Sequence, residues 1–169
     1  MEILPTTSAH YSGIATLYNS IDPELHLSAS DFTEGDRLRN PKFKTQRWVA
    51  IEQDEIRGAG YYTQSNWFAH PQNFMIWVGV HPLHQKGGIG SALYETIMQG
   101  LQPFDPLALR ARATADHPQS IRFLEKRGFH EVIRDILSEL NVQTFDPTRF
   151  TRLEDRFRGD GIEIKTLPE

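Results

Sequence analysis

The chain has 169 residues, 38% of them hydrophobic, which is enough for one well-buried core and short for two. Its 18 Lys and Arg residues against 22 Asp and Glu residues give a formal charge of −4, which argues against nucleic acid as a partner. The absence of cysteine excludes disulfides, thiolate metal sites and a cysteine nucleophile. We find neither a signal-peptide pattern nor an apolar run near the ~18 residues of a membrane span. We therefore expect a cytoplasmic protein with no membrane partner.

In chain order, the period of the apolar residues first predicts a strand, two helices and a hairpin. These elements are a strand over 1–5, a helix that Thr6, Thr7 or Ser8 caps and that reaches Ile21, a weaker helix over 28–40, and an antiparallel pair of strands over 45–53 and 56–64. Ser30 or Asp31 is the expected cap of the weaker helix. The hairpin turn, around Asp54 and Glu55, lacks the usual glycine.

The second half of the chain predicts strands and helices in alternation. Residues 73–80, NFMIWVGV, are almost wholly apolar, which is typical of a central strand buried on both faces. The remaining expected elements are a helix from Ile89 to about Leu101, a strand over 107–113, a helix from Pro118 that stops at Gly128, a long strand over 129–140, a charged helix after Asp146 and a last strand over 162–167.

Residues 81–93, HPLHQKGGIGSAL, place three glycines between the central strand and a helix. A glycine loop there exposes main-chain N–H groups at the positive end of the helix dipole, and missing side chains let a phosphate approach closely. The spacing excludes the two commonest nucleotide loops. The Walker sequence Gly-Lys-Ser/Thr is absent, and G-x-G-x-x-G fails because Leu93 stands at its third glycine.

The segment Gln85-Lys86-Gly87-Gly88-Ile89-Gly90 matches Q/R-x-x-G-x-G/A, the motif that carries coenzyme A in the GNAT superfamily of N-acetyltransferases. The resemblance extends to the strand ending in Val80-His81-Pro82 before the loop. It also includes HPQSIRFLEKRGF, 117–129, which is similar to a second signature of that family. The resemblance implies an α/β fold with a mixed, mostly antiparallel twisted sheet flanked by helices, and with strands that splay apart at the coenzyme cleft.

The same resemblance implies an acetyl-CoA-dependent N-acetyltransferase (an acyltransferase) that uses no metal. Acetyl-CoA is its cosubstrate, and a small-molecule or peptide amine attacks directly in a ternary complex. The expected catalytic residues are Val80, through its N–H group, and His117. The expected coenzyme contacts are Val78, Val80, Gln85, Lys86, Gly87, Gly88, Ile89, Gly90, Ser91, His117, Ser120 and Phe123.

The sequence departs from the family pattern at two positions. Leu124 stands where a tyrosine often protonates the leaving thiolate, and the 73–80 strand lacks the glutamate that often serves as general base. Either a base comes from residues 22–41, or ordered water takes the proton of the amine. The candidates in that stretch are Glu24, His26, Glu34 and Asp36. On the central strand, Trp77 is the residue most open to substrate contact.

These departures leave two further interpretations open. The domain over 1–145 can be a coenzyme A-binding module without turnover, or the inactive half of a tandem GNAT protein. Residues 146–169 then complete the domain's own sheet, form a dimer contact or begin a second domain. An apolar face on this segment must be buried somewhere, and an unpaired final strand makes a homodimer plausible.

Overall fold

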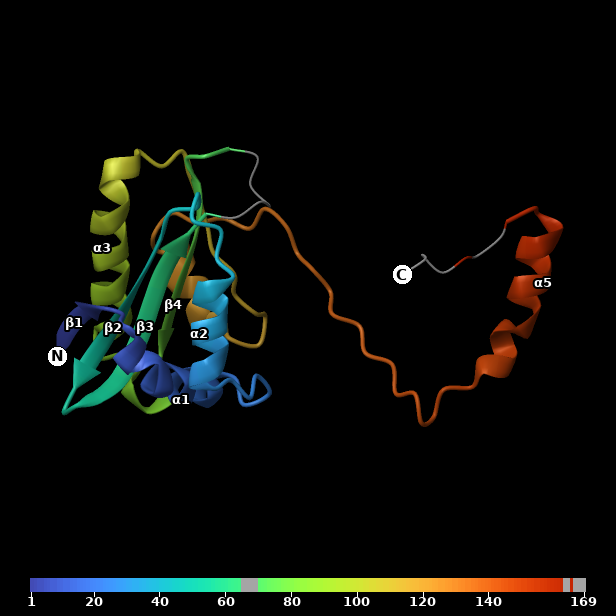
Figure 1. Cartoon of the computed structure of the whole chain (residues 1–169), viewed down its shortest axis with the longest axis horizontal. Coiled ribbons are helices and arrows are strands. Elements are labelled where there is room, and N and C mark those ends of the chain that lie inside the picture. Colours follow the sequence, from blue (N-terminus) through green and yellow to red (C-terminus); the bar gives the residue numbers. More distant parts are fainter. Residues whose placement is uncertain (65–69, 163–164, 166–169) are drawn as a thin grey trace. The chain divides into compact units, whose positions relative to one another are not determined.

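A computed structural model gives the structure of the chain and describes residues 1–64, 70–162 and 165. They form two compact units, Met1–Phe129 and His130–Glu169 (Figure 1). The first unit contains β1 (Glu2–Pro5), α1 (Tyr11–Ile21), α2 (Ala29–Arg37), β2 (Thr45–Glu52), β3 (Glu55–Thr63), β4 (Asn73–Val80), α3 (Ile89–Leu101), β5 (Ala108–Arg110) and α4 (Pro118–Glu125). The second contains a 3₁₀ helix, η4 (Pro147–Phe150), and α5 (Thr151–Gly159).

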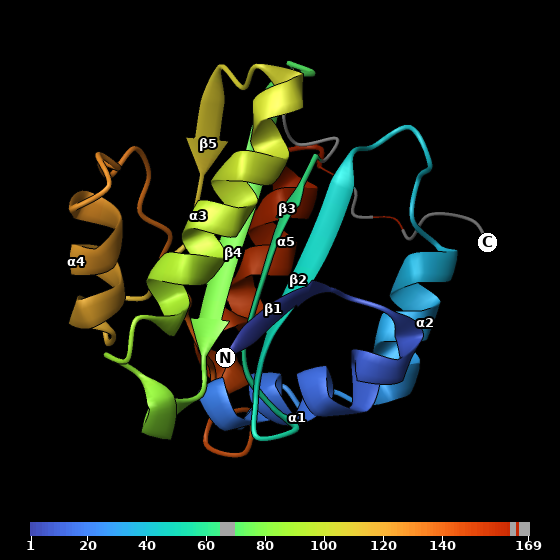
Figure 2. The same cartoon turned by 90° about the vertical axis from the view of Figure 1, so that its left-hand side faces the viewer.

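The first unit is built on one open, mixed sheet in the order β1-β2-β3-β4-β5 (Figure 2). Neighbours from β1 to β4 are antiparallel, and β5 runs parallel to β4. With its flanking helices, this sheet confirms the predicted fold class. The predicted elements up to Phe129 are present in the expected order.

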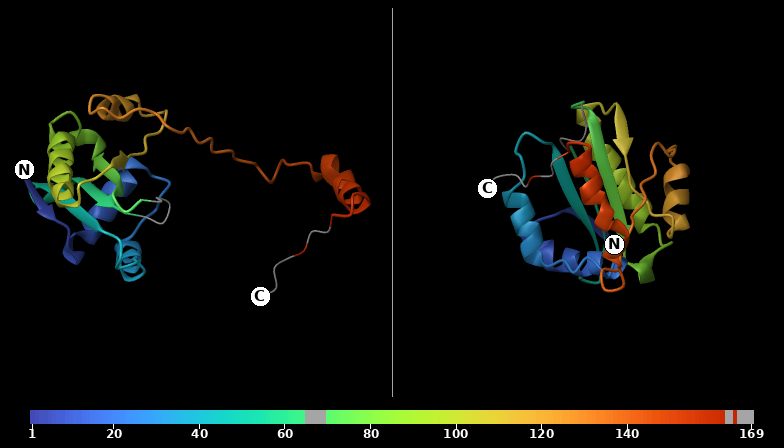
Figure 3. Two further views of the ribbon diagram at one scale, coloured as in Figure 1. Left: turned by 90° about the horizontal axis from the view of Figure 1, so that it is seen from above. Right: turned by 90° about the vertical axis from the view of Figure 1, so that its right-hand side faces the viewer.

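The core lies on both faces of the sheet, because alternate side chains of each strand point to opposite faces. α3 and α1 lie on opposite sides of the strands (Figures 1 and 3). On the α3 face, the completely buried side chains include Phe74, Leu93, Ile97 and Leu101. On the α1 face, Ile14 and Leu17 pack against Val49 and Ala59. The near-continuous apolar sequence of β4 is explained by this cover on both faces.

Local signals set most element ends. α2 is capped by Ser28 in a capping box with Asp31, so the expected cap at Ser30 or Asp31 is wrong by a few residues. The hairpin turn has two left-handed residues, Gln53 and Asp54, with φ of 54° and 61°. This pair of positive φ angles is the requirement of a type I′ turn, met here without glycine.

The predicted strand over 129–140 is wrong, because residues 130–140 have no regular secondary structure. Alternating apolar residues indicate a strand only where a neighbouring strand supplies hydrogen bonds, and side chains such as Ile136 and Leu137 are exposed here. β5 is likewise shorter than the 107–113 strand predicted. The last predicted strand, 162–167, falls mostly outside the described residues, and the boundary at 145/146 stays a prediction.

In the part of the chain that the structure describes, none of the helices is both long enough and apolar enough to cross a membrane.

Candidate functional site

The edge of β4 that faces β5 is only half paired. β5 pairs with β4 at three positions, the last of which joins Met75 to Arg110. Beyond that point β4 continues to Val80 and is paired along its other edge with β3, as far as Gly58. Among the described strands, this edge of β4 therefore has no partner after Met75, and the splay implied by the family resemblance stays a prediction.

The main-chain groups of Val78 and Val80 point to this open edge. The N–H of His81 donates to the carbonyl of Arg57 on β3, at 2.9 Å. Successive N–H groups of a strand point alternately to its two sides, so those of Val80 and Val78 face away from β3. The Val80 carbonyl accepts a hydrogen bond from Gln85 Nε2, at 3.3 Å, which holds the loop against the same edge.

The loop between β4 and α3 presents bare main chain to open space. Lys86 and Gly88 both have left-handed backbone, with φ of 66° and 89°. A Cβ atom added to Gly88 would meet nothing within 4 Å, and one added to Gly87 would meet only the His84 carbonyl, at 3.7 Å. A ligand can therefore approach the peptide groups of this loop without meeting side chains of the loop glycines.

The start of α3 adds unpaired N–H groups to the loop. The first helical hydrogen bond runs from the Ala92 N–H to the Gly88 carbonyl, at 3.0 Å. Earlier N–H groups of a helix have no carbonyl one turn before them. Those of Ile89, Gly90 and Ser91 therefore point out of the helix at the positive end of its dipole, an arrangement suited to a phosphate.

α4 lies beside α3 (Figure 2) and brings Phe123 to the loop. The Phe123 ring meets the Tyr94 ring edge-on, with centres 6.1 Å apart. A Cβ on Gly90 would lie 3.5 Å from Val80 and 3.6 Å from Phe123, which is ordinary contact. β4, α3 and α4 thus converge at Gly90, and the structure brings predicted coenzyme residues from all three elements together there.

Arg127, which no sequence motif indicated, also lies at this point. Its guanidinium donates to Ser91 Oγ at 2.9 Å and to the Phe123 carbonyl at 3.0 Å. Its Cζ lies 3.5 Å from the centre of the Phe123 ring. In the sequence, Lys126 and Arg127 are adjacent basic residues before a helix-ending glycine, and nothing in that pattern indicates which one turns toward α3.

His117 and Ser120 lie at the start of α4 with exposed side chains. His117 is the N-cap residue, and its Nδ1 is 2.8 Å from Thr114 Oγ1. Its carbonyl accepts the Ser120 N–H at 2.9 Å. These contacts hold the imidazole ring against the preceding turn, and the predicted roles of both side chains stay predictions.

His81 and His84 pack edge to face, with ring centres 5.4 Å apart. The His81 ring accepts a hydrogen bond from the Leu83 N–H, which explains its place in the turn after β4. Within residues 1–64, 70–162 and 165, no group of three or more acidic or histidine side chains is placed to hold a metal ion.

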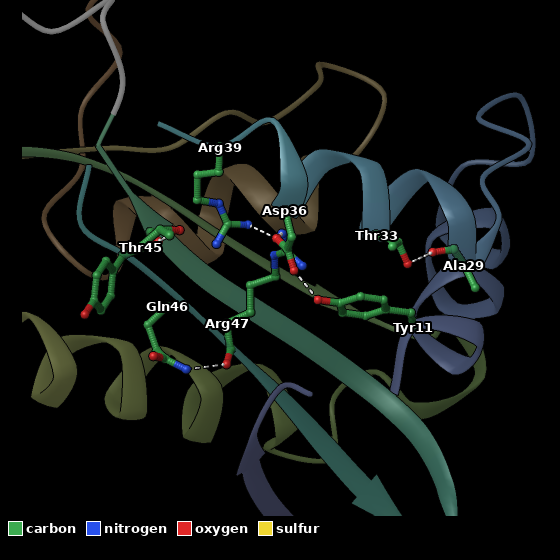
Figure 4. Close-up of polar contacts among 9 residues, drawn as sticks. Tyr11, Ala29, Thr33, Asp36, Arg39, Thr45, Gln46 and Arg47 are labelled. Atoms are coloured by element: carbon green, nitrogen blue, oxygen red, sulfur yellow. Dashed lines mark hydrogen bonds and ion pairs between the residues drawn. The ribbon is translucent and has the colours of Figure 1, made fainter. Parts of the chain in front are cut away.

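Asp36, at the end of α2, is held by three side chains (Figure 4). It accepts a hydrogen bond from the Tyr11 hydroxyl and forms ion pairs with Arg39 and with Arg47, the latter at 2.6 Å. Burial by itself raises the pKa of this carboxyl, but the Tyr11 hydrogen bond and the two arginine charges outweigh burial and hold the pKa below its usual value. The network fastens α2 to β2.

These contacts narrow the choice of general base. A carboxylate with a lowered pKa is a weak base near neutral pH, which disfavours Asp36. Glu34 pairs with Arg37 at 2.6 Å, and the hydrogen bond from that arginine lowers the pKa of the Glu34 carboxyl. The four candidates on residues 22–41 therefore differ. Among the ion pairs of the described residues, Glu34 and Asp36 are paired with arginine, whereas Glu24 and His26 are not.

We expect Asp36→Asn to destabilise the fold in a pH-dependent manner. The pKa of Asp36 is lower in the folded chain than the ordinary value of about 3.9, so its contribution is complete above that pH and is lost as the pH falls through the folded pKa. The side chain is 32% exposed, which limits the loss at pH 7 to about 1 kcal/mol. Urea unfolding at several pH values measures it.

Tyr11→Phe is the matched control, because it removes one hydrogen bond and keeps both the ring and the carboxylate. It should cost less at pH 7 than Asp36→Asn. A loss in Asp36→Asn that is equally large at pH 7 and at pH 3 would contradict this account.

An aromatic cluster covers the α1 face of β4. The Trp77 ring stacks on Tyr18 of α1, with centres 4.5 Å apart, and on Tyr61 of β3, at 5.9 Å. A Cβ on Gly79 would lie 2.2 Å from the Trp77 ring, so the indole folds over that glycine. Burial raises the pKa of the Tyr18 and Tyr61 phenols, which therefore stay neutral at physiological pH.

Residues 12–129 match the sequence profile described as "Acetyltransferase (GNAT) family". No curated protein sequence matches the chain.

Three similar solved structures are also acetyltransferases. The ribosomal-protein-alanine N-acetyltransferase of Brucella melitensis has a TM-score of 0.68 and 20% identity, over 77% of this chain and 85% of that chain. The aminoglycoside 6′-N-acetyltransferase AAC(6′)-IG of Acinetobacter haemolyticus has a TM-score of 0.62 and 17% identity, over 84% of this chain and 99% of that chain. AAC(6′)-Iy, in complex with a bisubstrate analogue containing CoA, has a TM-score of 0.63 and 13% identity, over 83% of this chain and 97% of that chain. At these identities the likeness shows a common fold.

Proposed function

We propose that this chain, which belongs to the GNAT family of acetyltransferases, transfers the acetyl group of acetyl-CoA to a primary amine by direct attack in a ternary complex. The observation that carries the proposal is the bare main-chain loop at the start of α3, placed beside the open edge of β4. The similar structures named above include enzymes for protein and aminoglycoside amines, which supports an amine acceptor in kind.

The residues of the loop fit the phosphates of the coenzyme. N–H groups from Lys86 to Ser91 hold the pyrophosphate, since the left-handed residues and the helix start turn them outward. Val78 and Val80 offer main-chain groups to the pantetheine arm along the open edge of β4. Phe123, Ser120 and His117 flank the coenzyme from the α4 side.

The chemistry requires charge stabilisation more than covalent catalysis. The Val80 N–H polarises the thioester carbonyl and stabilises the negative charge that develops on its oxygen when the amine attacks. The C–N bond forms first, and the C–S bond then breaks as the C=O bond is restored, so that coenzyme A leaves as its thiolate. Because the chain has no cysteine, a protein thiol cannot carry the acetyl group between these steps.

The acceptor nitrogen loses two protons during the transfer, and the coenzyme sulfur gains one. The ammonium first gives one proton to ordered water or to a base such as Glu24 or His26, which frees the lone pair for attack, and the nitrogen loses the second proton to water as the amide forms. The leaving thiolate gains one from water or from His117, since Leu124 occupies the position of the family's tyrosine. The acceptor approaches from the α1 face of β4, where the Trp77 ring lies against Tyr18 and Tyr61.

We expect His117→Ala to change the pH dependence of kcat if His117 protonates the thiolate. The limb of the pH–rate profile that reports the acid should move or disappear, and the rate should fall roughly tenfold to a hundredfold. Thr114→Val is the control, because it removes the hydrogen-bond partner of the ring and leaves the ring in place. A profile identical to that of the wild type in His117→Ala would assign protonation to water.

The alternative function is a coenzyme A-binding module without turnover. The specific observations that favour it are Leu124 and the carboxylate-free strand β4. An assay of thiol release and of acetylated product across a panel of small and peptide amines, with coenzyme binding measured in parallel, separates the two. Saturable binding with no product on any amine would favour the module.

A further inference from the structure

We infer that Arg127 is a coenzyme-positioning residue: it holds a positive charge beside the phosphate-binding loop and fastens α4 to the start of α3. The inference rests on the proposed function, because it assigns a partner to this charge within the same coenzyme site. The residue follows the end of α4 and comes just before Gly128, which ends that segment with φ of 83°.

The guanidinium of Arg127 is fixed by four contacts. It donates hydrogen bonds to Ser91 Oγ and to the Phe123 carbonyl, at 2.9 and 3.0 Å. It also lies against two rings, with Cζ 3.5 Å from the centre of Phe123 and 4.8 Å from that of Tyr94. Each contact uses a neutral group. The planar fork of arginine suits this set, since it donates to two acceptors while its flat face stacks on a ring, which the compact ammonium of lysine cannot do at the same time.

This half-buried cation has no acidic partner among the ion pairs of the described residues. Those pairs involve Arg37, Arg39, Arg47, Arg57 and Arg134. A partly buried charge is normally paired, because removing it from water costs free energy that a counter-charge offsets. The arginine therefore presents a positive charge in a fixed orientation, and an anionic ligand can supply the counter-charge.

The position of this charge selects the anion. Ser91 has one of the three unpaired N–H groups at the start of α3, and Arg127 is attached to its hydroxyl. The N–H groups and the guanidinium therefore lie at the same end of α3. The pyrophosphate that the loop holds is the anion that lies within reach of both. Arg127 thus adds a positive charge to the anion-binding N–H groups of the loop. Its contacts with Ser91 and Phe123 also hold α4 at a fixed distance from α3.

Calorimetric titration of the full chain with CoA, dephospho-CoA and pantetheine tests the inference. Arg127→Met keeps the aliphatic stem and removes the charge, and we expect it to lower the affinity for CoA about tenfold, the usual loss for one charge-assisted contact. Dephospho-CoA retains the pyrophosphate and should lose affinity equally. Pantetheine has no phosphate and should bind the variant as it binds the wild type. Arg127→Lys should recover part of the CoA affinity, because it restores the charge without the stacking.

Arg37→Met is the matched control, since it removes one positive charge from α2 on an exposed side chain. It should leave all three affinities unchanged. An equal loss for pantetheine and CoA in Arg127→Met would show that the residue only supports the fold and would overturn the inference. A loss confined to CoA would place the charge at the 3′-phosphate and contradict the assignment to the pyrophosphate. Failure of the wild type to bind CoA would overturn the proposed function itself.

Discussion

Gly88→Ala is expected to lower the affinity for CoA by at least about tenfold. Gly88 has φ of 89°, a conformation that costs an L residue roughly 1–2 kcal/mol. In the variant, either the loop keeps its shape at that cost, or it relaxes and the N–H groups of residues 86–91 no longer point toward the proposed pyrophosphate position. The new methyl group meets no protein atom within 4 Å, so it projects into the open space beside the loop, where we propose that the phosphate binds. Calorimetric titration with CoA measures the loss.

Gly90→Ala is the control for this substitution, two residues further along the same loop. Its added methyl group makes ordinary contacts with Val80 and Phe123, at 3.5 and 3.6 Å, and Gly90 does not have a positive φ. We expect it to bind CoA within about twofold of the wild type. Equal losses in the two variants would show that the left-handed backbone at Gly88 has no special part in binding.

Gly79→Ala is expected to destabilise the fold by about 1–3 kcal/mol, the usual cost of overpacking. The added Cβ would lie 2.2 Å from the Trp77 ring and 2.8 Å from Ile21 Cδ1. The indole cannot swing away cheaply, because Tyr18 and Tyr61 stack on it. Urea unfolding gives the free energy, and tryptophan fluorescence of the folded variant reports the displaced ring.

Gly35→Ala gives the matched control for Gly79→Ala. Gly35 lies inside α2, and a Cβ there would meet nothing within 4 Å. Alanine favours a helix interior over glycine by about 0.5–1 kcal/mol, so this variant should be more stable than the wild type. If Gly79→Ala unfolds at the same urea concentration as the wild type, the packing of Trp77 over Gly79 is not as described.

The glycine loop and its strand were predictable because their signals are local. A continuous apolar run, a glycine cluster and a helical period lie within residues 73–101, and each one sets backbone conformation over a few residues. The end of α4 was predictable for the same reason, since Gly128 alone supplies the left-handed residue there.

The rest depends on contacts between residues far apart in the chain. Arg127 reaches Ser91 across 36 positions, and Arg47 reaches Asp36 from another element, so no spacing rule indicates either pair. The strand predicted over 129–140 was wrong for a related reason. Alternation reports which side chains share a face, whereas a strand also requires a neighbouring strand to complete its hydrogen bonds. Dimer formation and the role of residues 146–169 stay predictions.

Amide NMR of the 19.4 kDa chain during titration with CoA tests the central claim most directly, namely that the loop opening α3 and the open edge of β4 form the coenzyme site. The account predicts saturable shifts at the N–H groups of residues 86–91, together with Val78 and Val80. The amides of α2 should stay unchanged. Saturation with shifts confined to other elements, or no saturable change at all, would contradict the account.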